Sequence, residues 1–88
     1  MQARIYVLGF VQGVGFRQFI KKNALFLGLK GFVRNLPDGR VEIVAKGAKE
    51  QIERLIDLCE KGPFFSEVKS VGVNFEEEEE FEGFKVLN

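Results

Sequence analysis

The chain has 88 residues, of which 45% are hydrophobic and 30% are charged, and its formal net charge at pH 7 is zero. This length supports one small domain over residues 1–88, and the lack of any run of about 18 apolar residues excludes a membrane-spanning helix. With no histidine and a single cysteine, the composition excludes an internal disulfide framework and indicates a reducing, cytoplasmic compartment.

The first expected strand covers residues 3–10, which are rich in Ile, Tyr, Val and Leu, and a glycine-rich loop follows it. Apolar side chains then recur at helical spacing, which predicts a helix that Gly28 ends. The face that this helix is expected to bury consists of Phe16, Phe19, Ile20, Ala24 and Leu27.

The remaining expected elements are strands over residues 30–36 and 40–45, a helix over 48–61, and strands over 68–75 and 84–87. This β-α-β-β-α-β order with a short fifth strand predicts an α+β, ferredoxin-like split β-α-β sandwich, with both helices on one face of an antiparallel sheet. The first and second strands then run in the same direction with the third between them. Asn35, at the end of the second strand, is therefore expected roughly 10 Å from the end of the first.

Charge is distributed unevenly along the chain. Residues 1–46 carry eight Lys or Arg and two Asp or Glu, whereas residues 47–88 carry five Lys or Arg and eleven Asp or Glu. The basic half contains the glycine-rich loop, so an anionic small molecule is the natural ligand there. A zero total charge argues against general nucleic-acid binding.

The loop before the first helix reads Gln12-Gly13-Val14-Gly15-Phe16-Arg17 and has no acidic residue. Backbone N–H groups at a helix N-terminus have no helical acceptor, and together with the helix dipole they can bind an anion. The two glycines permit a concave turn, and Arg17 can add a bidentate contact. The same spacing also fits a tight turn whose arginine faces solvent, and it matches neither the Walker nor the dinucleotide-binding pattern.

Two segments resemble the signatures of the acylphosphatase family. Residues 9–17 match the core G-x-V-Q-G-V-x-F-R, and residues 31–35 with Gly39, Val41 and Gly47 match G-F-V-x-N-x-x-x-G-x-V and its later glycine. The resemblance covers essentially the whole chain. One departure is Phe10, where many members carry Arg or Lys, and this change bears on substrate choice.

The resemblance implies hydrolysis of acyl phosphates to a carboxylate and inorganic phosphate. It implies that Asn35 orients the attacking water and that the phosphoryl group is bound by the Arg17 side chain and the backbone of Gln12, Gly13, Val14, Gly15, Phe16 and Arg17. A carboxylate leaving group needs little general-acid help, and phosphoryl transfer depends mostly on positioning. We therefore expect a metal-independent monomer without cofactor that acts on a small-molecule acyl phosphate, with no nucleic-acid or membrane partner.

Three other features have ordinary explanations. The acidic run at residues 76–80 could bind a cation or a basic partner, but we expect a solvated segment. Cys59 lies on the apolar stripe of the second helix, where a buried structural thiol is expected. Phe64 and Phe65 could either edge a substrate pocket or plug the core below the loop.

Two other function classes remain for comparison. An RNA-recognition module has the same element order, and Lys30-Gly31-Phe32 begins like its aromatic octamer. The later aromatic positions are missing, however, and the match falls on the second strand rather than the third. A domain that kept the fold but lost turnover is also conceivable, although Arg17 and Asn35 are both present.

Overall fold

A computed structural model describes residues 1–88, the whole chain. Its elements are β1 (Gln2–Phe10), α1 (Phe16–Phe26), β2 (Lys30–Asn35), β3 (Val41–Lys46), α2 (Lys49–Lys61), β4 (Glu67–Glu76) and β5 (Phe84–Leu87). Every expected element is present, and no bound differs from the prediction by more than two residues. Neither helix is long and apolar enough to cross a membrane.

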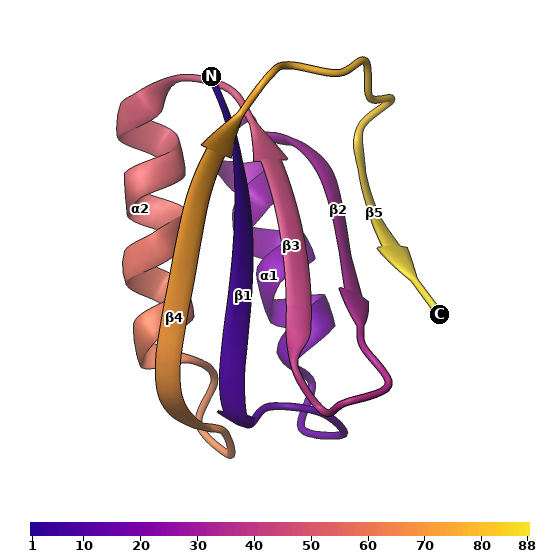
Figure 1. Ribbon diagram of the computed structural model, residues 1–88, viewed down its shortest axis with the longest axis vertical. Coiled ribbons are helices and arrows are strands. Elements are labelled where there is room, and N and C mark those ends of the chain that lie inside the picture. Colours follow the sequence, from indigo (N-terminus) through magenta and orange to yellow (C-terminus); the bar gives the residue numbers. More distant parts are fainter.

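The five strands form one sheet in the order β4-β1-β3-β2-β5, and both helices lie on the same face of it (Figure 1). The four longer strands are antiparallel neighbours, so the predicted ferredoxin-like fold is confirmed. The fifth strand differs from the prediction of an antiparallel sheet, because β5 pairs with β2 in parallel and makes the sheet mixed. A parallel pair requires a crossover rather than a hairpin, and here the chain reaches β5 from β4 at the opposite edge.

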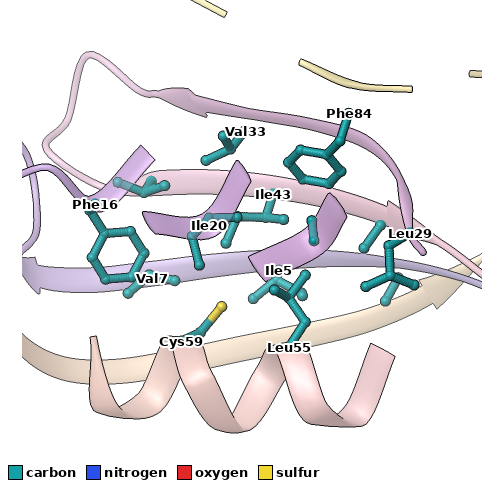
Figure 2. Close-up of a cluster of buried hydrophobic side chains, with 14 of the residues drawn as sticks. Ile5, Val7, Phe16, Ile20, Leu29, Val33, Ile43, Leu55, Cys59 and Phe84 are labelled. Carbon is teal, nitrogen blue, oxygen red and sulfur yellow. The ribbon is translucent and has the colours of Figure 1, made fainter. Parts of the chain in front are cut away.

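The core lies between the sheet and the two helices (Figure 2). Alternate residues of β1 and β3 point into it, including Ile5, Val7 and Ile43, all fully buried. The predicted face of α1 is confirmed, since Phe16, Ile20 and Ala24 are buried and Phe19 and Leu27 pack against them. From α2, the buried side chains are Ile52, Leu55 and Cys59.

The opposite face of the sheet carries a network of charged side chains centred on Glu42 in β3. Glu42 is only 3% exposed and accepts hydrogen bonds from Arg4 Nη1 at 2.8 Å, Arg34 Nε at 2.5 Å and Tyr6 Oη at 3.1 Å. Burial alone would raise the pKa of this carboxyl. Its three donors outweigh that effect and hold the pKa below its ordinary value.

The acidic run is not the purely solvated segment that was expected. Glu76 ends β4 and accepts a hydrogen bond from Arg4 Nε at 2.9 Å, and the Gln2 side chain also donates to it. The backbone N–H of Glu79 donates to Gln2 Oε1 at 2.8 Å, and Lys46 Nζ donates to the Glu79 carbonyl at 2.9 Å. These contacts fix the start of the β4–β5 connection to β1 and β3.

Candidate active site

The loop over residues 11–15 and Asn35 lie at the same end of the sheet (Figure 1). The strand register accounts for this, because Val7 of β1 and Asn35 of β2 both pair with Val41 of β3. The two strands run in the same direction, so both chains leave the sheet at that end. This arrangement is the one predicted from the topology.

Left-handed backbone at two glycines shapes the loop. Gly13 has φ 76° and Gly15 has φ 80°, a region that other L-residues adopt only with strain. A Cβ placed on either glycine meets no atom within 4 Å, so the loop surface is open there rather than packed. The glycines are therefore required by the backbone conformation and not by a close contact.

The loop presents a series of unused hydrogen-bond donors. No backbone N–H from residue 12 to residue 18 donates to a carbonyl of the chain, and no side chain caps the helix. The first turn of α1 contains no acidic residue that could compete for these donors. Free N–H groups at the positive end of a helix are suited to bind an anion.

Gly13 and residues 15–18 of this donor series line a pocket of about 280 Å³ between the start of α1 and β5. The pocket is lined by Val11, Gly13, Gly15, Phe16, Arg17, Gln18 and Val86. Arg17 is its only charged residue and is half-buried; its Nη1 donates to the Leu87 carbonyl over 3.4 Å, a long and weak hydrogen bond. The guanidinium is therefore held near the pocket while most of its donors stay free.

Asn35 is half-buried at the end of β2 and does not line this pocket. Its Oδ1 is buried, and no group of the protein donates a hydrogen bond to it. A buried acceptor without a partner costs roughly 1–3 kcal/mol, and such atoms are uncommon in folded proteins. An unsatisfied carboxamide at the same end of the sheet as the glycine-rich loop has the chemistry needed to hold a small polar molecule.

The side chain of Gln12 has a role of its own. Its Nε2 donates to the carbonyl of Leu36 at 2.8 Å and to that of Arg40 at 3.0 Å. Both carbonyls belong to the turn over residues 36–40, which connects β2 to β3 and begins directly after Asn35. The side chain of Gln12 therefore connects the loop to the strand end that carries Asn35.

Sequence reasoning missed Val86, Gln18 and Leu87. The first two line the pocket, and the carbonyl of Leu87 accepts the Arg17 hydrogen bond. The short apolar run at the C-terminus indicated a strand, but nothing in it indicated which neighbour the strand would choose. Pairing with β2 brings β5 beside α1 and makes it one wall of the pocket.

Other candidates from the sequence lie away from the pocket. Cys59 is fully buried as expected, and burial raises the pKa of its thiol to about 12, which makes it a poor nucleophile. Phe64 and Phe65 are 92% and 75% exposed, so neither is a core plug, and neither lines the pocket. Phe10 is also exposed and outside the pocket lining. No group of three or more His, Cys, Asp or Glu side chains is arranged to hold a metal ion.

Comparison with known proteins identifies one family. The acylphosphatase family profile matches residues 3–86. An acylphosphatase of Caldivirga maquilingensis is 50% identical over 88 residues, covering 98% of this chain and 93% of that protein. One from Thermus thermophilus is 50% identical over 80 residues and covers 91% of each. A crystal structure of acylphosphatase from Bacillus subtilis superposes with a TM-score of 0.95 at 38% identity, covering 99% of this chain and 98% of that one.

Proposed function

The chain belongs to the acylphosphatase family and hydrolyses acyl phosphates, and we propose that its loop, Arg17 and Asn35 carry out this reaction. In this proposal the backbone N–H groups of residues 12–17 and the Arg17 guanidinium bind the phosphoryl oxygens. Asn35 orients the water that attacks phosphorus. The predicted activity is confirmed at the level of the family, and the residue roles are our proposal.

The single observation that carries these roles is the row of free backbone donors beside Arg17. A phosphoryl group bound there would receive several N–H hydrogen bonds and the charge of the guanidinium. Such preorganised donors stabilise the charge on the equatorial oxygens of the transition state. No acidic side chain lines the pocket to repel the substrate.

The unsatisfied Oδ1 of Asn35 supports its role toward water. It can accept a hydrogen bond from the nucleophilic water and so restrict the direction of attack. The water oxygen forms a bond to phosphorus as the bond between phosphorus and the acyl oxygen breaks. The bonding electrons leave with the carboxylate, and the proton of the water passes to phosphate or solvent.

This chemistry accounts for a site without histidine. The conjugate acid of the leaving carboxylate has a pKa of about 4, so the carboxylate departs at neutral pH without being protonated. A loose transition state also demands little activation of the water. We accordingly propose that turnover needs neither a metal ion nor a cofactor, and that the chain acts as a single-domain cytoplasmic monomer on a small acyl phosphate.

The test is release of inorganic phosphate from acetyl phosphate in the presence of EDTA. We expect Arg17→Ala and Asn35→Ala each to lower kcat/KM at least about 100-fold, since loss of one preorganised donor costs roughly 3–4 kcal/mol. Arg54→Ala and Asn74→Ala are matched controls, because both side chains are exposed on other elements, and they should keep full activity. Near-normal rates in a folded Arg17 or Asn35 variant would remove that residue from the mechanism.

A further inference from the structure

Both N–H hydrogens of the Gln12 carboxamide form hydrogen bonds within the protein. Nε2 has two hydrogens, and it makes two hydrogen bonds of ordinary length, to the carbonyls of Leu36 and Arg40. With these bonds made, Nε2 cannot also donate to a bound phosphate. Its side chain therefore contributes to the site in some way other than direct contact through this nitrogen.

The β2–β3 turn does not need Gln12 to satisfy its backbone. The Leu36 carbonyl also accepts from the N–H of Gly39 at 3.1 Å, and the Arg40 carbonyl accepts from the N–H of Leu36 at 2.8 Å. The turn is thus closed by its own hydrogen bonds. What Gln12 adds is a connection between this closed turn and a loop that lies 24 to 28 residues earlier in the chain.

That connection joins the two halves of the proposed catalytic site. Gln12 belongs to the loop that binds the phosphoryl group, and Leu36 directly follows Asn35. Val11 and Val14 pack the loop against the core, but this apolar packing does not involve the β2–β3 turn. The two hydrogen bonds of Gln12 are the only ones between the loop and that turn, so they are the polar contacts that set the position of the loop relative to Asn35.

We infer that Gln12 is a positioning residue, which sets the distance between the bound phosphoryl group and the water oriented by Asn35. The inference rests on the proposed roles of the loop and of Asn35. In-line attack requires the reacting atoms about 3–3.5 Å apart, and a displacement of about 1 Å can lower the rate about 100-fold. Phosphate affinity should change much less, because the N–H groups and Arg17 stay within the loop itself.

Gln12→Met tests this directly, since it keeps the length and neutrality of the side chain and removes both donors. We expect kcat for acetyl phosphate to fall about 10- to 100-fold, while the inhibition constant of inorganic phosphate changes less than about 3-fold. Gln51→Met is the matched control on α2, outside the site, and should change neither value. The melting temperature of Gln12→Met should fall by less than about 10 °C, because the turn keeps its own hydrogen bonds.

The double variant Gln12→Met/Asn35→Ala identifies how Gln12 acts. If Gln12 works by placing Asn35 relative to the phosphate, its substitution should have little further effect on kcat once the Asn35 side chain is absent. An undiminished loss of kcat in the Asn35→Ala background would overturn the inference, as would an unchanged kcat in Gln12→Met alone. A parallel rise in the phosphate inhibition constant would also overturn it, by indicating direct participation in binding.

Failure of the proposed function gives a different pattern. If Asn35 does not orient the water, Asn35→Ala alone retains its rate, whatever Gln12→Met does. If the loop does not bind phosphate, Arg17→Ala leaves the phosphate inhibition constant unchanged. The single variants therefore test the proposed roles, and the double variant tests the positioning by Gln12.

Discussion

Replacing Glu42 by glutamine should destabilise the fold strongly while leaving the chemistry intact. The carboxylate accepts three hydrogen bonds, and each such bond to a charged group contributes about 1.5–3 kcal/mol. The full sum is an upper limit, because Arg4 and Arg34 are 27% and 44% exposed and can turn toward water, and glutamine keeps one acceptor. We expect a loss of about 2–4 kcal/mol in the free energy of unfolding.

This loss can be measured as a shift in melting temperature. With an unfolding entropy of about 2.1 cal/mol/K per residue, a domain of this size should melt about 10–20 °C lower. Glu53→Gln, on the exposed side of α2, is the control and should shift the transition by no more than about 2 °C. At a temperature where both variants are folded, their phosphate release from acetyl phosphate should match that of the unmodified chain.

The effect should also depend on pH in a defined direction. The pKa of Glu42 is lowered in the folded protein, so its stabilisation is present above the ordinary glutamate pKa of 4.5 and is lost as pH falls through the lower folded value. The difference in melting temperature between the unmodified chain and Glu42→Gln should therefore reach its full value of about 10–20 °C at pH 7 and become smaller below about pH 4. A gap below about 3 °C at pH 7, or one that stays constant down to pH 3, would refute this reasoning.

Gly31, Cys59 and Arg17 can each be tested by a single substitution or labelling experiment. Gly31→Ala should lower the free energy of unfolding in urea by more than about 3 kcal/mol, because the new Cβ would lie 1.8 Å from the Val44 carbonyl oxygen. Gly28→Ala is the control: Gly28 also has a positive φ but faces open space, so the loss should be about 1–2 kcal/mol. Equal losses in the two variants would contradict the clash. Cys59 should react with a thiol reagent at pH 8 only on unfolding, since burial raises its pKa to about 12, and rapid labelling of the folded protein would disprove this. Arg17→Lys should recover less than about a tenth of normal kcat/KM in the acetyl phosphate assay, because an ammonium cannot replace a planar fork; full recovery would mean that charge alone suffices.

The sequence by itself determined the local parts of this protein. Periodicity and turn residues predicted each strand and helix to within two residues, because backbone conformation and the choice of buried face are encoded over short windows. The glycine-rich loop and the motif around Asn35 were equally visible. The topology also predicted that the loop and Asn35 would lie at one end of the sheet, and the strand register confirms this placement.

Tertiary structure decided how these parts meet. It placed β5 in parallel beside β2, which made Val86 a wall of the pocket and the Leu87 carbonyl an acceptor for Arg17. It also directed the Gln12 side chain to the β2–β3 turn and bound much of the acidic run to β1 and β3. The physical reason is common to all of these contacts: each joins groups far apart in the chain, and their distance and direction are set only when the sheet has closed.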